Sequence, residues 1–365
     1  MYEIIRTFNS VGQGAFYTEE FYDSSKDAYF TMVYDCGSYG NPTLIKKEIK
    51  HSGLKEDIDL LCISHFHADH INGLEYLLDN YNVKKILLPF LHQEEKVEVY
   101  LANTISQSSE FIRNFSLNPQ STIHEKSDNT QIITVNINEG SQPEQNNELQ
   151  HINELQENIS SGQPIQIDNN SNWIYVPFNF DFNTRSKQLK TELDSKGIDI
   201  HDFENIYKTR KDDIIDIYKS KSVTGDLNTN SLVIYSGHVD KCRCHTELFK
   251  PNYYHYFHRH KECGCIYMGD YNTKGTQKWN EFEKGFKQYF DCIGIIQIPH
   301  HGSRHNYNPK LNFKPRLFSI MSAGIHNKFR HPHGSTLKQI ILHDGIPIIV
   351  TENPHSKFIQ KIYIY

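Results

Sequence analysis

The stretch Leu60-Leu61-Cys62-Ile63-Ser64-His65-Phe66-His67-Ala68-Asp69-His70 is the most informative part of this 365-residue chain. It starts as an apolar run of the length typical of a buried strand and ends with four metal-ligand side chains in six positions. A loop that leaves a strand end can splay alternate side chains, so His65 and His67 are expected to bind one metal ion. Asp69 and His70 then point toward a second ion. Imidazoles combined with a carboxylate suit Zn²⁺, Mn²⁺ or Fe, and a chance histidine cluster would not be expected at the end of a buried strand.

The segments around this motif predict an α/β layered domain, because strands and helices alternate along the chain. A helix is expected at 74–78, directly after the motif, and another apolar strand at 85–90. The same spacing rules predict the other elements. Strands are expected at residues 4–11, 15–21, 29–34, 173–178, 231–235, 266–268, 293–298, 317–322, 346–351 and 358–364, and helices at 43–51, within 186–219, at 277–289 and at 335–342.

Two later strands also end in residues of metal-ligand type. Gly269-Asp270 ends one of them, where the carboxylate could bridge two ions, and His300-His301-Gly302 follows the strand at 293–298. Alone, each is a weak signal, since Gly-Asp is a common turn and a histidine pair before glycine is unremarkable in a loop. Ligands of α/β proteins gather at the ends of strands along one rim of a sheet, so these groups are expected to join the motif at 65–70. The sequence does not distinguish His300 from His301, and both remain candidate ligands.

Taken together, these motifs resemble the metallo-β-lactamase superfamily, whose fold is a four-layer αβ/βα sandwich. The resemblance is closest to the hydrolase domain of bacterial DNA-uptake (competence) channel proteins and its free-standing relatives. It spans nearly the whole chain except for about 93–220 and 237–264. The motifs that carry it are Val11-Gly12-Gln13-Gly14, Asp35-Cys36-Gly37, residues 65–70, Asn228-Thr229-Asn230-Ser231-Leu232-Val233, Gly269-Asp270, His300-His301-Gly302-Ser303 and Asn327-Lys328-Phe329-Arg330-His331-Pro332.

The resemblance implies a single hydrolase domain over 1–365 that binds two divalent metal ions, Zn²⁺ or Mn²⁺. It implies the ligands His65, His67, Asp69, His70, Asp270 and one of His300 and His301, with Asp35 orienting them without touching metal. In the expected reaction a metal-bound hydroxide, held by Asp69, attacks the substrate. Asn327 and His331 are implied to lie beside the metals, where His331 could serve the leaving oxygen. Ser303 and Arg304 could contact a phosphate, although an ordinary solvated loop explains them equally well.

The expected activity is that of a metallo-hydrolase, namely a phosphodiesterase or nuclease that cuts DNA or RNA. One alternative is a carbon-centred hydrolase of the same fold, acting on a thioester, lactone or β-lactam. Another is an effector module in a bacterial multi-protein system that a partner protein activates. The net charge of −6 argues against a bulk basic platform for nucleic acid, but metal ions can supply positive charge in a local groove. The resemblance therefore implies a nucleic acid or nucleotide as the substrate, and the acidic charge leaves cyclic or short nucleotides open.

One departure from the superfamily concerns the first metal site. Members with a complete first site use a third histidine from a separate loop, and this chain has none in a matching context. His92, after the strand at 85–90, and His238, after the strand at 231–235, are the candidates. Each is more simply interpreted as a solvated loop histidine. The remaining option is an ion held by His65, His67, Asp270 and water.

Two segments are predicted as insertions into the domain. Residues 93–220 form a polar and helical insertion in which 138–172 are predicted to be flexible, and 237–264 form a Cys/His-rich hairpin insertion. Four thiolates of that hairpin could make a structural zinc site, or the last of them could face the core instead. These thiolates are Cys242, Cys244, Cys263 and Cys265. Residues 138–172 and 242–265 are also candidate contacts for a protein partner.

The cellular location follows from the same composition. The seven cysteines are an odd number, which does not suit a secreted disulfide framework. No apolar run approaches 18 residues, so no membrane span is expected. The N-terminus lacks the apolar core of a signal peptide. A cytoplasmic protein is therefore expected.

Overall fold

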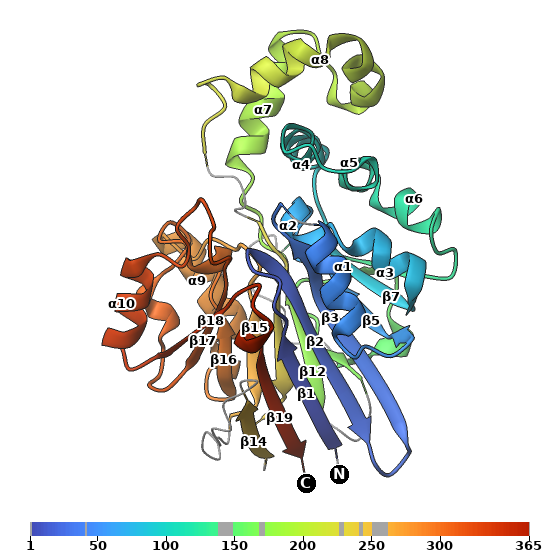
Figure 1. Cartoon of the computed structure of the whole chain (residues 1–365). Coiled ribbons are helices and arrows are strands. Elements are labelled where there is room, and N and C mark those ends of the chain that lie inside the picture. The colour runs from blue at the N-terminus through green and yellow to red at the C-terminus, as the bar shows by residue number, and fades with distance from the viewer. Residues whose placement is uncertain are drawn as a thin grey trace.

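The computed structural model describes residues 2–40, 42–137, 149–167, 172–225, 230–240, 244–249 and 262–364. Two large sheets lie face to face, with helices on their outer faces (Figure 1). The first sheet has the strand order β10-β8-β7-β5-β3-β2-β1-β19-β14, and the second has the order β18-β17-β16-β15-β13-β12-β11-β9. The two ends of the chain lie together, on the side away from helices α7 (Thr184–Ser195) and α8 (Phe203–Lys219).

The strand bounds show how far the sequence predicted the sheets. Strands β12 and β19 have the predicted bounds, and the other predicted strands are present with shifts at their ends. The first sheet contains β1 (Tyr2–Phe8), β2 (Gly14–Asp23), β3 (Ala28–Ser38), β5 (Leu60–Cys62), β7 (Lys85–Pro89), β8 (Gln131–Val135), β10 (Asn158–Ile159), β14 (Cys244–Phe249) and β19 (Phe358–Ile364). The second contains β9 (Gln150–His151), β11 (Ile165–Gln166), β12 (Trp173–Phe178), β13 (Val233–His238), β15 (Gly264–Tyr267), β16 (Ile293–Gln297), β17 (Phe318–Ser322) and β18 (Ile346–Val350), and β4 (Asp57–Ile58) pairs with β6 (Asn82–Val83).

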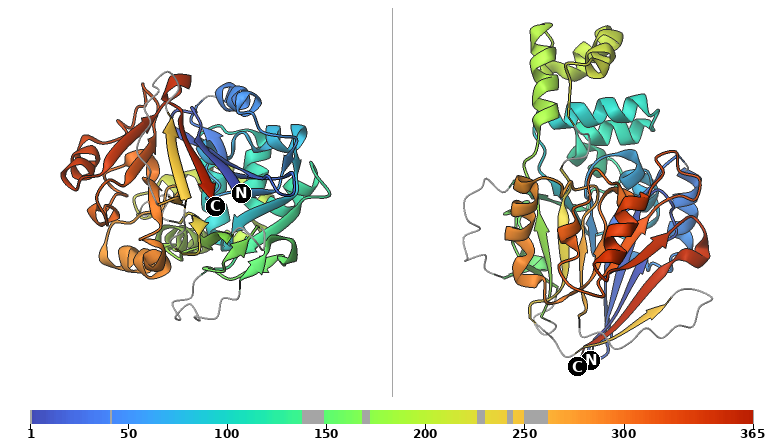
Figure 2. Two further views of the ribbon diagram at one scale, coloured as in Figure 1. Left: turned by 90° about the horizontal axis from the view of Figure 1, so that it is seen from below. Right: turned by 90° about the vertical axis from the view of Figure 1, so that its left-hand side faces the viewer.

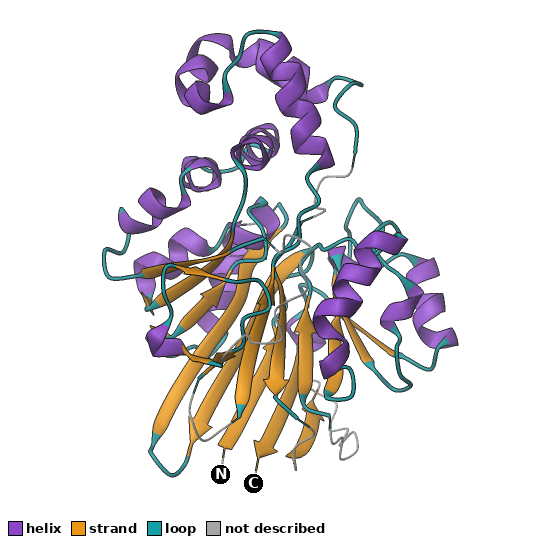
Figure 3. Ribbon diagram, turned by 180° about the vertical axis from the view of Figure 1, so that it is seen from behind, coloured by secondary structure: helices purple, strands orange, loops and turns teal. Residues whose placement is uncertain are grey.

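The central strands are buried on both faces, which explains why they appear in the sequence as continuous apolar runs. In β5, Leu60 and Cys62 face the core between the two sheets, whereas Leu61 faces the outer core. Helices α1 (Pro42–His51) and α3 (Leu74–Asn80) cover that outer face. Helices α9 (Thr276–Phe286) and α10 (Gly334–Leu342) cover the outer face of the second sheet (Figure 3). These four layers are the predicted αβ/βα sandwich, the metallo-β-lactamase fold.

A buried ionic cluster joins the two sheets inside the inner core. The Arg6 guanidinium Nε of β1 lies 2.6 Å from Glu19 Oε1 of β2. Glu19 also accepts hydrogen bonds from three groups of the second sheet, namely the hydroxyls of Tyr175, Ser236 and Tyr267, at 2.7–2.8 Å. A buried charge is tolerated only when it is paired and fully hydrogen-bonded. This cluster therefore fixes the position of one sheet against the other.

Strands of the two sheets divide the predicted insertion 93–220 into two helical parts. Helices α4 (Gln93–Ile105), α5 (Glu110–Leu117) and α6 (Pro119–His124) precede β8, and α7 (Thr184–Ser195) and α8 (Phe203–Lys219) follow β12. Between them lie β8 and β10 of the first sheet and β9, β11 and β12 of the second, so this range is not one continuous insertion. Helices α4, α5, α7 and α8 share a separate apolar core and form a cap beyond the end of the sandwich (Figure 2).

The two other predicted segments are described only in part. Of residues 138–172, those at 138–148 and 168–171 lie outside the described residues, and 149–167 contain β9, β10 and β11. In the segment 237–264, β14 pairs with β19 at the edge of the first sheet, so the chain between β13 and β15 crosses from one sheet to the other. No helix in the described part of the chain is long and apolar enough to cross a membrane.

The predicted structural zinc stays a prediction. Cys242 lies outside the described residues. Cys263 and Cys265 are buried in the core between the sheets, and Cys244 packs against that core. Burial raises the pKa of Cys265 to about 12, which keeps its thiol protonated and favours the alternative role in the core. No cysteine belongs to a potential metal-ligand cluster among the residues that the structure describes.

Candidate metal centre

The histidine motif leaves the carboxyl end of β5 and enters a short helix. His65 and His67 lie in the connecting loop, and Asp69 and His70 lie in α2 (Ala68–Ile71). The backbone of β3 passes very close to this helix, at Gly37. A Cβ atom on Gly37 would lie 2.3 Å from the carbonyl oxygen of Asp69, a separation that no other residue type could accommodate. Glycine at position 37 therefore allows β3 of the first sheet to pack directly against α2.

The second sheet supplies the opposite wall of the site. Asp270 follows β15, and its backbone N–H donates to Ser231 Oγ at 3.1 Å. His300 and His301 follow β16, both with a positive φ, 49° and 57°. This backbone conformation is uncommon for residues other than glycine and often marks a functional turn. It places two consecutive histidines next to Asp270.

Asp270 lies at the centre of the cluster. Its Oδ1 is 3.3 Å from His70 Nε2 and 3.8 Å from His301 Nε2. Its Oδ2 is 3.7 Å from both His65 Nε2 and His300 Nε2. Candidate ligand atoms gather in two groups, each with all its atoms within 4.8 Å of one another. The groups are His65, His70 and Asp270, and Asp69, His70 and His301.

Two of the imidazoles direct their Nδ1 protons away from the cluster, to oxygens of the surrounding fold. His70 Nδ1 donates to Asp35 Oδ2 at 2.7 Å, and His301 Nδ1 donates to the carbonyl oxygen of Ser322 at 2.9 Å. In the neutral form of the imidazole, which is the form that binds a metal ion, each bond leaves a lone pair on Nε2 that faces the carboxylates.

The other two imidazoles are held by side-chain oxygens. His65 Nδ1 lies 3.0 Å from the hydroxyl of Ser64, which itself donates to Asp35 at 2.6 Å and so accepts from the imidazole. His300 Nδ1 donates to Asn306 Oδ1 at 2.9 Å, while the amide nitrogen of Asn306 donates to the Asp270 carbonyl. Asp35 thus contacts His70 directly and His65 through the Ser64 hydroxyl, and the orienting role that the resemblance implies for it stays a prediction.

This arrangement fits metal ions because acceptors face acceptors. The Nε2 atoms of His65, His70 and His301 are buried without a hydrogen-bond partner, and so are both ring nitrogens of His67. Buried polar atoms are normally paired, and lone pairs that point at a carboxylate repel unless a cation lies between them. The donor set of imidazole nitrogen and carboxylate oxygen suits Zn²⁺ and Mn²⁺. The residues present therefore fit two divalent ions.

The charges of the cluster agree with this interpretation. Burial lowers the pKa of His65 and His67, because it disfavours the charged imidazolium. Burial acts in the same direction on His70, but two neighbouring carboxylates outweigh it and hold the pKa of His70 well above its usual value. The metal-free chain therefore keeps a proton on this ring, and a bound metal ion would displace it. For Asp69 and Asp270, burial is opposed by the adjacent imidazoles, which hold the pKa of both below its usual value. The carboxylates therefore stay ionised and attract a cation.

Asn327 and His331 have different positions relative to the cluster. Asn327 does not face it: its amide nitrogen donates to the carbonyls of Gly324 and His331, and its oxygen accepts the His331 N–H at 2.8 Å. It therefore positions the loop that carries His331. The His331 ring lies beside His300, with ring centroids 5.5 Å apart. Burial, together with the imidazoles nearby, lowers the pKa of His331 to about 4.

The two other candidate ligands lie outside the cluster. His92 is the residue at the start of α4, where its backbone N–H donates to Glu95 Oε2 at 2.9 Å. His238 ends β13, the strand that begins next to Ser231, so it lies roughly 20 Å away along that strand at ~3.3 Å per residue. Neither belongs to a candidate cluster among the described residues. The structure does not support either as the third ligand of the first ion.

Sequence reasoning did not identify Asn103, a residue of the cap whose side chain hydrogen-bonds to the backbone of the histidine motif. Asn103 of α4 donates to the carbonyl of Phe66 at 2.8 Å and accepts the Ala68 N–H at 3.2 Å, so it grips the backbone on both sides of His67. An isolated asparagine within a helix gives no sequence signal for such a role.

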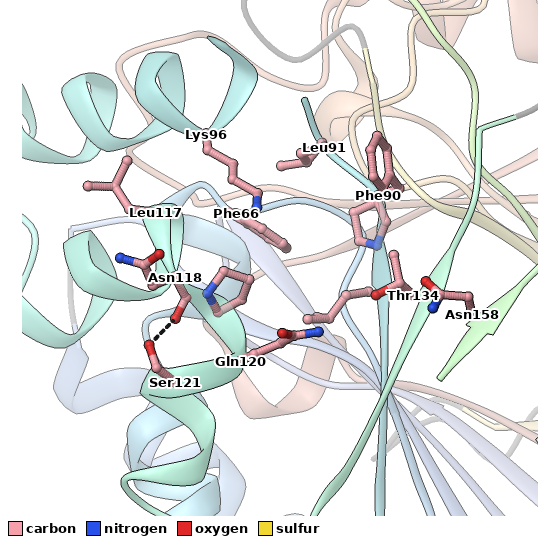
Figure 4. A pocket seen from close by; sticks show the side chains of 13 residues that line it. Phe66, Phe90, Leu91, Lys96, Leu117, Asn118, Gln120, Ser121, Thr134 and Asn158 are labelled. Carbon is pink, nitrogen blue, oxygen red and sulfur yellow. Dashed lines mark hydrogen bonds between the residues drawn. The ribbon is translucent and has the colours of Figure 1, made fainter. Parts of the chain in front are cut away.

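Phe66 also lines a cavity of about 400 Å³ between α4–α6 and strands β7 and β8 (Figure 4). The lining of that cavity has no histidine or carboxylate, so it is not the reacting centre.

A family model matches the part of the chain that contains the histidine motif. Residues 30–100, which run from β3 through the motif into α4, match the metallo-β-lactamase superfamily. The crystal structure of the short form of human tRNase Z is similar at 8% sequence identity, over 96% of this chain and 92% of that chain, with a TM-score of 0.36. No curated protein matches the sequence. The closer resemblance to DNA-uptake channel proteins stays a prediction. The superfamily match and the histidine–aspartate clusters support a metal-dependent hydrolase with the metallo-β-lactamase fold.

Proposed function

We propose that this chain is a dinuclear metal-dependent phosphodiesterase that cuts DNA or RNA. The observation that carries the proposal is the position of Asp270, whose two carboxylate oxygens lie within 3.8 Å of four imidazole Nε2 atoms. Such a carboxylate can bridge two cations. A pair of cations polarises a phosphodiester and lowers the pKa of a water molecule toward neutrality.

The two oxygens of Asp270 suggest how the ligands divide. His301 belongs with Asp69 and His70, because these three form one cluster, and it is the proposed histidine of the second site. His300 approaches the other oxygen, the one that also faces His65. We assign it as the third imidazole of the first site, which His65 and His67 begin.

The residues around the ions have separate tasks. Asp69 is ionised, and its Oδ2 lies 3.4 Å from His301 Nε2. Its carboxylate can therefore bind the second ion together with His301 and accept a hydrogen bond from the attacking water. His331 accepts a hydrogen bond at Nδ1 from the Gln13 amide nitrogen, 3.3 Å away. Its remaining proton is therefore on Nε2, where it can donate a hydrogen bond to a substrate oxygen. With its lowered pKa, His331 acts at neutral pH as a hydrogen-bond donor and not as an imidazolium.

The test is cleavage of labelled single- and double-stranded DNA and RNA with added Mn²⁺ or Zn²⁺, with metal content measured on the same preparation. Asp69→Ala is expected to abolish cleavage. His238→Ala is the matched control, because it removes a histidine from the far end of β13 and should leave cleavage unchanged. Bis(p-nitrophenyl) phosphate is included as a small phosphodiester. Two bound ions without hydrolysis of any phosphodiester would refute the proposal, and thioesters and lactones would then be the substrates to test.

A further inference from the structure

A second cavity opens directly beside the metal centre. It has a volume of about 250 Å³ and is lined by Ser303, Arg304, His305, Phe329, Arg330, His331 and His333. Its wall is shared with the centre through His331, whose ring centroid lies 5.5 Å from that of His300 and 6.2 Å from that of His301. A group seated in the cavity is therefore adjacent to whatever reacts at the metal ions.

The lining of this cavity is basic. Arg304 and Arg330 are exposed, and none of the lining residues is a carboxylate. Lys274 adds a third cation, because its Nζ lies 3.3 Å from the Arg304 carbonyl oxygen. The whole chain carries a net charge of −6, so this local excess of positive charge runs against the overall balance. The guanidinium group of an arginine can donate two parallel hydrogen bonds to phosphate oxygens.

Exposed aromatic rings border the same cavity. Phe329 is 45% exposed, and Tyr39, which it meets edge-on at a centroid distance of 5.2 Å, is 42% exposed. The ring centroid of Phe329 also lies 5.8 Å from that of His331, with an angle of 24° between the ring planes. Aromatic rings next to basic side chains form the stacking platforms of single-strand-binding proteins. The aromatic and basic groups thus supply both contacts that one nucleotide needs.

We propose that this cavity binds the nucleotide next to the scissile phosphate of a single-stranded nucleic acid. Its base stacks on Phe329, and its phosphate is held by Arg304 and Arg330. The volume lies below the ~300–1,000 Å³ of pockets that enclose whole small ligands, which suits one unit of a longer chain. A duplex keeps its bases stacked and cannot offer one to Phe329. This inference rests on the proposed function, because it identifies the substrate of the same centre.

The experiment measures binding without cleavage. Full-length protein in EDTA is titrated into a fluorescein-labelled oligothymidylate of about ten nucleotides, within the ~4–16-nucleotide range of single-strand sites, and fluorescence anisotropy reports the affinity. An abasic oligomer of equal length and a duplex are the comparison ligands. Phe329→Ala is expected to weaken oligothymidylate binding about 5–150-fold, the measured range for loss of one stacked base, and to leave abasic binding unchanged. Phe329→Trp should restore the affinity.

The arginines are tested by the double variant R304A/R330A. It should weaken binding of both oligomers and reduce the salt dependence, by about 0.7 in the slope of log affinity against log salt for each lost phosphate contact. Ile325→Ala is the control, because Ile325 is 57% exposed in the same loop and lies outside the cavity lining. Equal binding of both oligomers by wild type, unchanged binding by Phe329→Ala, or preferred binding of the duplex would each overturn the inference.

A separate readout keeps this inference distinct from the proposed function. Hydrolysis of bis(p-nitrophenyl) phosphate by the metal-loaded wild type tests the phosphodiesterase without using oligonucleotide binding. If hydrolysis is absent while oligothymidylate binding depends on Phe329, the subsite stands and the proposed function fails. If hydrolysis is present while binding ignores Phe329 and both arginines, the function stands and the subsite is refuted.

Discussion

Replacing Asp35 by asparagine tests whether residues behind the ligands determine metal affinity. The Asp35 carboxylate accepts three hydrogen bonds, from His70 Nδ1 at 2.7 Å, from the Ser64 N–H at 2.7 Å and from the Ser64 hydroxyl at 2.6 Å. An asparagine amide has one oxygen and one NH₂ group. Whichever way it turns, its NH₂ meets a donor, so at least one bond is lost. If the lost bond is that of His70, the imidazole can move its proton to Nε2, the atom meant for the metal.

The expected magnitude follows from measured effects of such supporting residues, which reduce metal affinity about 10–100-fold. In free energy this is about 1.4–2.7 kcal/mol. The assay is competition between the chelated protein and a calibrated chelator for Zn²⁺, with Asp59→Asn as the matched control. Asp59 also accepts a backbone N–H, that of Thr31 at 2.7 Å, but it precedes β5 at the end opposite the site. Wild-type affinity in Asp35→Asn, or an equal loss in both variants, would refute the reasoning.

Elemental analysis after dialysis distinguishes the two ion sites. His301→Ala should reduce bound metal from two ions to one, whereas His300→Ala should lower the affinity for one ion and leave the other bound. Arg6→Met should lower the free energy of unfolding by about 3–5 kcal/mol, because it leaves Glu19 buried without its cation, and adding Glu19→Gln should recover part of the loss in denaturant titrations. In the chelated protein, the lowered pKa of His331, about 4, means that the folded chain takes up this proton at lower pH than the unfolded chain. The free energy of unfolding is therefore unaffected by His331 above the usual histidine pKa, and it decreases as the pH falls from there toward 4. His331→Gln should flatten that part of the pH profile of unfolding.

The sheets and most residues of the histidine–aspartate cluster were predictable because their signals are local in sequence. Strands buried on both faces must be apolar throughout, so β12 was predicted at its observed bounds, 173–178. The motif at 65–70 concentrates ligand-type residues within one loop. Asp270 and His301 each end a strand of the same sheet. Such features depend on neighbouring residues alone, and a single sequence contains them.

The cap was not predicted in detail because its buried face is polar. Helix α4 buries Glu95, Glu98 and Asn103 along with its apolar residues. Their partners come from distant segments: Glu95 accepts from Asn230, Glu98 pairs with Arg185 at 2.9 Å, and Asn103 holds the motif itself. Burial raises the pKa of Glu98 to about 7, which shows how strongly this face departs from an ordinary solvated helix. Apolar periodicity is weak in a helix that combines apolar contacts with hydrogen bonds and an ion pair made only in the folded chain.

The candidate ligands come from both sheets, so the packing of the inner core determines the geometry of the candidate metal centre. The first sheet supplies the residues at 65–70, and the second supplies Asp270, His300 and His301, so no single layer can form either site. The position of one sheet against the other is fixed by close packing and by the cluster around Arg6 and Glu19. A shift of the sheets that moves Asp270 by 1 Å relative to His65 would disrupt bonds whose ideal lengths are about 2.0–2.2 Å. Arg6→Met should therefore weaken metal binding as well as stability, although no atom of Arg6 touches the site. Unchanged metal affinity in a destabilised Arg6→Met protein would show that packing alone holds the two sheets in register.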